Sequence, residues 1–471
     1  MASGANTKKA RVISGMRPTG RMHVGNYFGA LANWVRLQNE TTPVGAQHAA
    51  PQSSGAPPTS PSSDSPLATR HSPLPSYECF YFIADWHSLT SDYADTSGIA
   101  QNVIEMATDY LAGGLDPNKS TIFLQSLVPE HAELHLLLSM VTPLGWLERV
   151  PTYKEALENV KDKDLHNYGF LGYPVLQCAD IVIYSSPEIS GLYVPVGEDQ
   201  VSHVEASREI VRRFNLAFAE LLPNFTNEND LYGIATACGI APEIGPAITP
   251  TFPVPYADKV RAVKEAFRVS SLQARGYYVA NGLGGLSYLL TEPQHMLTKT
   301  PRIPGLDGRK MSKSYGNTIM LSESDADIRA KTKVMVTDPA RKRRNDPGNP
   351  DVCPVYDWHK LFAPKSAAGE YTAEGKATLE WSANGCRTAG IGCIECKAAM
   401  ADNLIKWITP VRERRVEYEQ HPQRVLEVLD AGSKKARAVA QSTMERVREA
   451  VFDWNKKRKE VAESKKAARS E

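Results

Sequence analysis

Residues 11–38 read "RVISGMRPTGRMHVGNYFGALANWVRLQ", and this stretch decides how the rest of the chain is interpreted. It begins with a short β-rich run, Arg11–Gly15, that stops at a glycine. After the turn "MRPTG", apolar side chains recur at helical spacing, at Val24, Tyr27, Leu31, Trp34 and Val35. A strand, a Gly/Pro turn and a helix are the usual opening of a nucleotide-binding α/β unit.

The alternation of strand and helix continues beyond this opening. Further strands are predicted at "ECFYFIA" (78–84), "TIFLQ" (121–125) and "GLYVPVG" (191–197). Further helices are predicted at residues 96–111, 131–140 and 199–214. Alternating β and α segments indicate a parallel sheet covered by helices. We therefore expect an α/β fold, with a Rossmann-type catalytic domain followed by an α-helical domain.

Two segments interrupt the pattern. Residues 41–76 are rich in Pro, Ser, Ala, Thr and Gly and lack the apolar content to order themselves, which predicts a disordered insertion. Residues 226–292 are rich in Gly and Pro and predict a second insertion, to which the sequence assigns no role. The remaining expected units are a flexible N-terminus (1–10), the catalytic domain (11–225, resuming at 293–320), a helical domain (321–455) and a frayed basic tail (456–471).

Composition limits the class of protein. A chain of 471 residues is too long for one small core and predicts two or three domains. The formal net charge is +1, so any RNA-binding surface must be a local patch. No apolar run has the length of a membrane span, and the N-terminal residues contain no secretory signal. Seven cysteines, an odd number, argue against a disulfide framework, so a reducing cytoplasm is the expected compartment.

Two motifs far apart in the sequence carry the chemistry. The first is "PTGRMHVGN", residues 18–26, and the second is "GRKMSKS", residues 308–314. Together and in this order, they resemble the motifs of class I aminoacyl-tRNA synthetases. A helix N-terminus offers N–H groups and a positive dipole end to ATP phosphates, and lysines in a mobile loop suit a leaving pyrophosphate. The resemblance implies catalytic roles for His23, Asn26, Lys310 and Lys313, with Mg²⁺ neutralising the phosphate charge.

Other stretches resemble the tryptophanyl branch of that class. They are "SGMRPTGRMHVGNYFGAL", "FIADWHSLT", "LDPNKSTIFLQS", "YPVLQCADIVIY" and "VPVGEDQVSHVE". "GEDQ" is the discriminating piece, because the tyrosyl branch usually has a Gly-Gly-x-Asp-Gln pattern there. The resemblance implies activation of L-tryptophan with ATP and transfer to the terminal adenosine of tRNA-Trp by a homodimer. The alternatives are a tyrosyl enzyme and a non-catalytic paralogue that senses RNA or tryptophan.

The resemblance also assigns binding residues. Asp180 would accept the indole N–H of tryptophan, and a buried carboxylate aimed at one donor rejects ligands that lack it. The rest of the tryptophan site would be His87, Tyr173, Gln177 and Gln200. The ATP site would contain Ser14, Thr19, Gly25, Asn26, Gly197, Glu198, Asp199, Lys310, Met311, Ser312, Lys313 and Ser314. Arg17 and Gln177 depart from the bacterial pattern, which often has glutamine and methionine at these two positions.

A cysteine cluster lies near the end of the chain. Cys386, Cys393 and Cys396 form C-x6-C-x2-C, and Cys353 lies upstream. Four thiolates bind either Zn²⁺ or an iron–sulfur cluster, and spacing alone does not separate them. A subset of tryptophanyl-tRNA synthetases carries this element in the anticodon-binding domain with a [4Fe–4S] cluster, so the resemblance implies that cluster here. The gap after Cys353 is longer than in that subset. The basic run Arg341–Arg344 and the helices after Arg412 are candidate tRNA contacts.

Overall fold

The structure is a computed structural model. It describes residues 8–40, 77–151, 165–223, 270–280, 284–297, 303–366 and 369–470, with a few isolated positions between 153 and 268. The predicted insertion at 41–76 lies outside the described residues, as does most of the one at 226–292. Of the latter, helix α13 (Leu272–Ala280) and strand β6 (Gly284–Leu286) are described, and β6 pairs antiparallel with β5 (Leu221–Pro223).

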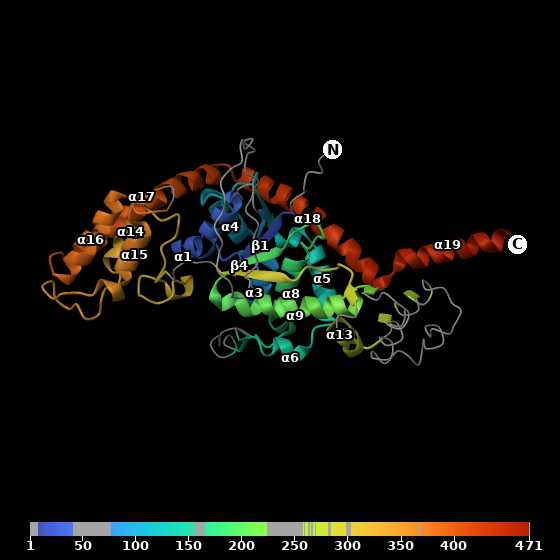
Figure 1. The fold of residues 1–471 in the computed structure, drawn as a ribbon. Helices are drawn as coiled ribbons and strands as arrows, with labels where there is room; N and C mark the ends of the chain where they lie inside the picture. The colour runs from blue at the N-terminus through green and yellow to red at the C-terminus, as the bar shows by residue number, and fades with distance from the viewer. Residues whose placement is uncertain are drawn as a thin grey trace, which may run out of the picture.

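The centre of the molecule is a five-stranded parallel sheet in the order β3-β2-β1-β4-β7 (Figure 1). The strands are β1 (Ala10–Met16), β2 (Tyr77–Ile83), β3 (Ser120–Leu124), β4 (Leu192–Val196) and β7 (Pro293–Leu297). β1 is central, with β2 and β4 on either side, so the strand order reverses beside it. Ligands of such sheets bind at the carboxyl ends of the strands where the order reverses. The α/β fold is confirmed.

Helices cover both faces of the sheet. One group follows the first strands: α1 (Val24–Asn26), the π-helix η1 (Tyr27–Leu31), α2 (Ala32–Asn39), α3 (Asp85–Asp92) and α4 (Ile99–Ala112). The other contains α5 (Glu130–Ser139), α6 (Leu144–Leu147), α8 (Tyr168–Val182) and α9 (Val201–Phe218). Short 3-10 turns η2 (Gln125–Leu127) and η3 (Glu198–Gln200) follow β3 and β4.

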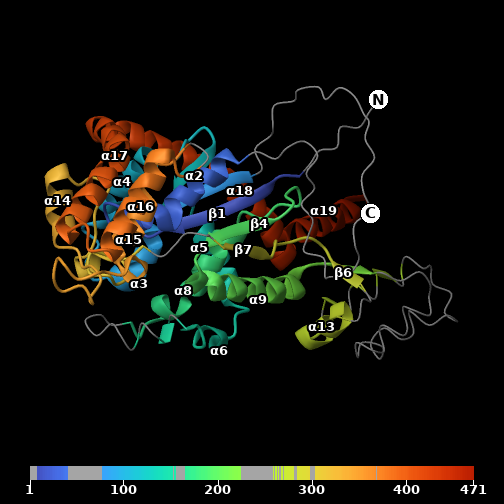
Figure 2. The same ribbon diagram turned by 60° about the vertical axis from the view of Figure 1, so that its left-hand side comes forward.

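The C-terminal region is helical. After η4 (Lys313–Tyr315) it contains α14 (Asp325–Lys333), η5 (Pro350–Val352), α15 (Pro354–Phe362), α16 (Ala373–Arg387), α17 (Cys393–Gln420), α18 (Pro422–Phe452) and α19 (Trp454–Ser470). Figures 1 and 2 show α14–α17 gathered at one end of the molecule and α19 extending from the other. The tail predicted to fray instead continues as α19, in keeping with the helix propensity of its Lys, Arg, Glu and Ala residues.

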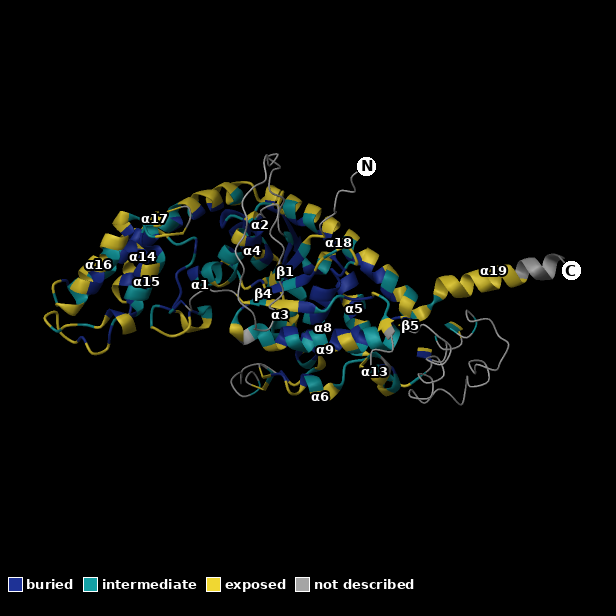
Figure 3. Cartoon of the chain, in the orientation of Figure 1, coloured by how far each residue is buried: buried dark blue, intermediate teal, exposed yellow. Residues whose placement is uncertain are grey.

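Two hydrophobic cores lie on the two faces of the sheet, because successive side chains of a strand point to opposite sides. Val12 and Tyr81 belong to one core, and their neighbours Ile13 and Phe80 belong to the other. Figure 3 shows the buried residues concentrated along this sheet and the helices beside it. None of the helices in the described part of the chain has the length and apolarity needed to cross a membrane.

Helix α18 crosses the edge strand β3 and contributes to both cores. Its first half supplies Val425 and Leu429 to one core, and its second half supplies Ala436 and other residues to the opposite one. A Cβ atom at Gly432 would lie 1.8 Å from the carbonyl oxygen of Ile122, so only glycine fits at the crossing. The Leu124 N–H donates to the Ser433 hydroxyl at 3.2 Å. The region predicted as a separate helical domain (321–455) therefore shares the catalytic core through its last helix.

Candidate active site

The turn between β1 and α1 is fixed by a reciprocal pair of hydrogen bonds. The Asn26 N–H donates to His23 Nδ1 at 3.2 Å, and the His23 N–H donates to Asn26 Oδ1 at 3.2 Å. Because a backbone N–H only donates, His23 Nδ1 is the acceptor and Nε2 carries the proton of the neutral ring. Burial and the nearby Lys313 charge lower the pKa of His23 to about 4. His23 is therefore a neutral hydrogen-bond donor through Nε2 at physiological pH.

The lysine loop is folded down onto this turn. Lys313 Nζ donates to the Thr19 carbonyl at 2.6 Å, and the Gly25 N–H lies 3.2 Å from Met311 Sδ. A Cβ atom at Gly25 would lie 2.9 Å from His23 Nδ1 and 3.1 Å from Met311 Sδ, so the approach of the two motifs depends on glycine. Burial lowers the pKa of Lys313. The predicted residues His23, Gly25, Asn26, Met311 and Lys313 are thus brought together.

Asn317 holds the loop in shape and was not predicted. Its side chain accepts from the Ser312 N–H at 2.8 Å and donates to Asp307 Oδ1 at 2.7 Å and to the Lys310 carbonyl at 3.1 Å. The Ser312 and Ser314 hydroxyls lie 2.8 Å apart. Lys310, in contrast, is exposed. The loop therefore has one lysine docked on the turn and one at the surface.

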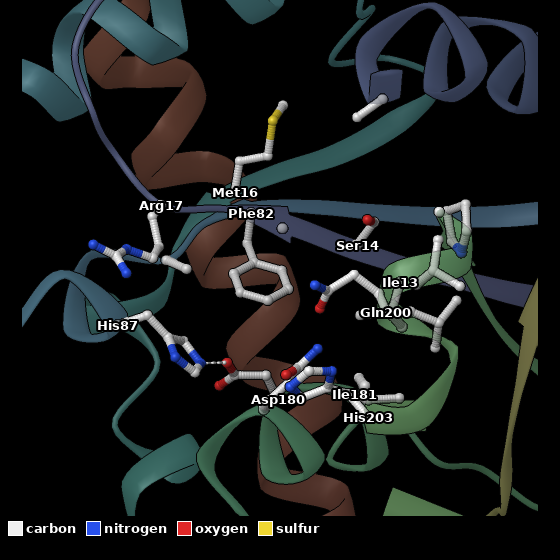
Figure 4. A pocket seen from close by; sticks show the side chains of 18 of the residues that line it. Ile13, Ser14, Met16, Arg17, Phe82, His87, Asp180, Ile181, Gln200 and His203 are labelled. Atoms are coloured by element: carbon white, nitrogen blue, oxygen red, sulfur yellow. Dashed lines mark hydrogen bonds and ion pairs between the residues drawn. The ribbon is translucent and has the colours of Figure 1, made fainter. Parts of the chain in front are cut away.

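A cavity of about 510 Å³ lies at the carboxyl ends of β1, β2 and β4 (Figure 4). Residues 15–17 line it and lead directly into the turn, so the cavity and the phosphate turn are continuous along the chain. Among the predicted residues, its lining contains Ser14, His87, Tyr173, Gln177, Asp180, Gly197 and Gln200. Glu198 is exposed in η3 beside them, and the Asp199 side chain lies outside the described residues. Seven separately predicted positions thus line one cavity.

Asp180 is the buried anion of this cavity. Its Oδ1 lies 2.6 Å from His131 Nδ1, its Oδ2 lies 2.9 Å from His87 Nε2, and Gln125 Nε2 lies 2.8 Å from each oxygen. Burial alone would raise the pKa of Asp180, but hydrogen bonds and charge from His131 and His87 outweigh burial and lower it to about 2. Figure 4 shows His87 and Asp180 facing one another in the cavity. The carboxylate is ionised and held in one orientation.

Three residues that support this site were missed by the sequence analysis. Gln125 directly follows β3, and a polar residue at the carboxyl end of a parallel strand is a usable signal. His131 lies in the apolar helix α5, and its Nε2 is 2.8 Å from the Tyr184 hydroxyl. His203 Nε2 lies 2.7 Å from the Tyr173 hydroxyl. Nothing in the local sequence distinguishes the two histidines from ordinary core residues.

The four predicted metal-ligand cysteines occupy neighbouring helix ends. Cys353 precedes α15, Cys386 lies in the last turn of α16, and Cys393 and Cys396 lie in the first turn of α17. Burial and the charges of the other three thiols raise the pKa of Cys396 to about 12. Within the described ranges, however, no three Cys, His, Asp or Glu side chains are arranged to hold a single metal ion. The side chains are near one another without forming a mononuclear site.

Arg341, predicted as a candidate tRNA contact, is instead used inside the protein. It is buried, and its guanidinium donates to the Arg344 carbonyl at 2.8 Å, to the Ile391 carbonyl at 2.6 Å and to Cys386 Sγ at 3.7 Å. Its charge also opposes the rise in the pKa of Cys386 that burial causes. Arg341 therefore supports the cysteine region.

Comparisons with known proteins agree on one group. The family model for class I tRNA synthetases (W and Y) matches residues 5–54, 67–232 and 274–407. A tryptophan–tRNA ligase of Ralstonia nicotianae is 43% identical over 446 residues, covering 94% of this chain and 98% of that protein. One of Thermotoga maritima is 37% identical over 441 residues, with 94% and 98% coverage. The crystal structure of the Campylobacter jejuni tryptophanyl-tRNA synthetase with ADP and tryptophan is 25% identical, has a TM-score of 0.60, and covers 94% of this chain and 99% of that one.

Proposed function

This chain belongs to the class I tRNA synthetases for tryptophan and tyrosine, and from that membership we propose that it works as a tryptophan–tRNA ligase through the cavity and turn described above. It activates L-tryptophan with ATP to form tryptophanyl-adenylate and pyrophosphate. It then transfers the tryptophanyl group to the 3′-terminal adenosine of tRNA-Trp. The observation that carries the residue assignments is the ionised, fully enclosed carboxylate of Asp180 in a cavity at the carboxyl ends of the strands.

Asp180 selects the indole ring. Without a ligand, Asp180 accepts from His131, from His87 and from Gln125, whose Nε2 is shared between the two carboxylate oxygens. The indole N–H of tryptophan adds a donor to this buried charge from the cavity side, whereas phenylalanine brings none. Tyr173, Gln177 and Gln200 line the same cavity and contact the rest of the amino acid.

His23 and Lys313 act on the ATP phosphates. The Nε2–H of neutral His23 and the side chain of Asn26 donate to the α-phosphate as the tryptophan carboxylate attacks it. Lys313 leaves the Thr19 carbonyl to follow the departing pyrophosphate, and Lys310 joins it from the exposed end of the loop. Mg²⁺, when bound, neutralises phosphate charge. Ser14 and Gly197 are the parts of the ATP site that also line the cavity.

Exchange of labelled pyrophosphate into ATP tests the ligase. We expect exchange that depends on tryptophan and that tyrosine does not support. A signal with tyrosine alone would contradict the proposal, as would exchange with neither amino acid under conditions in which the protein is folded. Charging of tRNA-Trp transcripts then tests the transfer step.

Cys353, Cys386, Cys393 and Cys396 hold a [4Fe–4S] cluster in this proposal. The ligand chemistry fits, since four cysteines converge at helix ends and Arg341 places positive charge beside Cys386. Zinc, which four thiolates also bind, is the alternative occupant. When bound, the cluster would pin α15, α16 and α17 together. Anaerobic purification followed by iron, sulfide and zinc assays tests it, and a zinc-only protein would contradict it.

The ligase also acts as a homodimer in the cytoplasm in this proposal. The homodimer rests on the resemblance of the motifs, and the compartment on the odd number of cysteines, seven, which argues against a disulfide framework. Sedimentation equilibrium of the purified chain tests the assembly, because a monomer at micromolar concentration would contradict it.

A further inference from the structure

The residue before His23 is held from two sides. The Met22 N–H donates to Asp109 Oδ2 at 2.6 Å, and the Met22 carbonyl accepts from the Leu321 N–H at 2.9 Å. Leu321 follows the lysine loop, so one of these bonds ties the turn to that loop. The other ties it to helix α4, which contains Asp109. The backbone position of Met22, and with it the direction in which the His23 side chain points from the turn, therefore depends on the Asp109 carboxylate.

Asp109 in turn depends on the C-terminal region. It has no exposed surface, and its Oδ1 accepts a hydrogen bond from Nη1 of Arg415, whose side chain is only 2% exposed. Arg415 also bonds Glu105 and lies 3.1 Å from Glu419 Oε1, and Arg21 of the turn donates to Glu105 at 2.9 Å. These five residues, Arg21, Glu105, Asp109, Arg415 and Glu419, form an ion network between the turn, α4 and α17.

Two more arginines of helix α17 make contacts beside this network. Arg412 donates to the Glu323 carbonyl at 2.7 Å and pairs with Asp325, in the segment between the lysine loop and α14. Arg414 donates to the Ala112 carbonyl at the end of α4 at 2.7 Å. The basic run after Arg412, predicted to contact tRNA, is thus bound to the catalytic region by three of its arginines. The same helix begins at Cys393, and the rise of an α-helix places Arg415 about 30 Å along its axis.

We propose that Asp109 is a positioning residue for the His23 turn, and that its ion pair with Arg415 makes the geometry of the turn depend on where α17 lies. The proposal rests on the ligase function described above and adds a connection between the helical region and the phosphate site. Asp109 acts through the Met22 backbone and touches no substrate. Its role is to fix the entry of the chain into α1.

The physical reason is the cost of an unpaired buried charge. While Arg415 is in place, Asp109 is a charged acceptor, and a hydrogen bond to a charged acceptor is stronger than one to a neutral group. If α17 moved away, the carboxylate would lose its counter-ion in a water-free environment and would take up a proton or turn toward another donor. Burial already raises the pKa of Asp109 to about 6 despite Arg415 and the Met22 N–H. Its charge also opposes the lowering of the Lys313 pKa, so it is close enough to influence both motifs.

A double-mutant cycle on the full-length chain tests the proposal. Arg415→Gln leaves the buried Asp109 carboxylate without its cation, whereas Asp109→Asn removes the charged acceptor of the Met22 N–H and leaves Arg415 paired with Glu105 and Glu419. The double variant replaces the ion pair by two neutral amides. Tryptophan-dependent pyrophosphate exchange is measured for all four proteins, together with their melting temperatures. We expect each single variant to lose about tenfold in kcat with KM for tryptophan nearly unchanged, and the double variant to recover part of that loss.

Arg414→Gln is the matched control. Arg414 lies next to Arg415 in sequence and also bonds α4, but through the Ala112 carbonyl and not through Asp109. It should retain kcat within about twofold, since one exposed contact to a neutral acceptor contributes little. Single variants with lowered melting temperatures but wild-type kcat would show that Asp109 is only structural and would overturn the proposal. If Arg415→Gln does not fold, the isosteric variant Asp109→Asn alone tests the proposal, by its kcat and melting temperature relative to wild type. A wild-type protein without tryptophan-dependent exchange would instead contradict the ligase function itself.

Discussion

The carboxylate of Asp180 and the imidazole of His131 lie 2.6 Å apart, and both side chains are removed from solvent. A carboxylate only accepts hydrogen bonds, so His131 Nδ1 carries a proton, and Nε2 of the same ring lies 2.8 Å from the Tyr184 hydroxyl. Tyr184, His131 and Asp180 thus form a hydrogen-bonded chain whose last member lines the cavity. The orientation of Asp180 is fixed by two residues that are not part of the cavity lining.

Asp180→Asn should lower kcat/KM for tryptophan about 100-fold, because the amide keeps the shape but removes the charge that the indole N–H needs. KM for ATP should change little. Tyr184→Phe is the comparison, since it removes one neutral hydrogen bond at the far end of the chain and should cost about threefold. Pyrophosphate exchange at varied tryptophan measures both. Equal effects of the two substitutions would show that Asp180 does not contact the ring.

Lys313→Met should lower the rate of adenylate formation about 100-fold or more, because the loop loses the charge that follows the pyrophosphate. Binding of tryptophan alone should be retained, since Lys313 lies on the turn and not in the cavity lining. Arg309→Gln is the matched control. Arg309 is an exposed cation of the same loop that pairs with Asp307, so its loss should change the rate by less than about twofold. Rapid-quench measurement of adenylate formation distinguishes the two variants. A similar loss of rate in both would show that the total positive charge of the loop matters, and not Lys313 in particular.

His23 should make the folded state sensitive to mild acid. Burial and Lys313 lower its folded pKa to about 4, whereas an unfolded histidine titrates near 6.5. The unfolded state therefore binds more protons between these values, and stability falls as the pH drops from about 6.5 toward 4. Urea unfolding of wild type and His23→Gln at several pH values measures the difference. Between pH 6.5 and 4, the free energy of unfolding should fall less in the variant than in wild type. Parallel plots of this free energy against pH would show that His23 is charged in the folded protein.

Cys393→Ser should impair charging of tRNA-Trp more than tryptophan-dependent pyrophosphate exchange. The reason is position, since Cys393 begins α17, which belongs to the group of helices α14–α17 at one end of the molecule (Figure 1), and is not part of the cavity lining. Aminoacylation and exchange assays on the same preparation give the ratio, and an iron assay reports whether the cluster is lost. Equal loss of both activities would contradict a role limited to the tRNA step.

The α/β fold was predictable because four strands of the sheet and several of its helices carry a local pattern, whereas β7 (Pro293–Leu297) and helix α8 (Tyr168–Val182) were not predicted. Strand β2 is a continuous apolar run, and the helix after "HVGN" has regular apolar spacing. The path of α18 was not predictable. An amphipathic pattern shows that a helix has a buried face, but the surface that covers it is set by tertiary packing, as at Gly432.

The residues of the candidate site likewise divide into those predicted from local motifs and those that were not predicted. His23, Gly25 and Lys313 were found because they lie in two compact motifs, and Asp180 was found because "QCAD" resembles a family motif. His131 and Asp109 were missed because each acquires its role from a partner distant in the sequence. Asn317 was missed although its partners Ser312, Lys310 and Asp307 are near it in the chain, because no pattern of residue types marks the bonds that shape a loop. Asp109 illustrates the difficulty, since neither its own helix nor the sequence around Arg415 indicates that the two meet.

The crossing of α18 over β3 has a consequence for how the protein is made. Leu124 emerges from the ribosome 308 residues before Gly432, as the difference 432 − 124 shows. At cellular synthesis rates this interval lasts roughly 15 to 60 s. Throughout that time the edge of the nascent sheet has neither its covering helix nor the Ser433 hydroxyl. An uncovered strand edge pairs readily with other chains, so the newborn polypeptide needs protection, for example by a chaperone, until α18 has been synthesised.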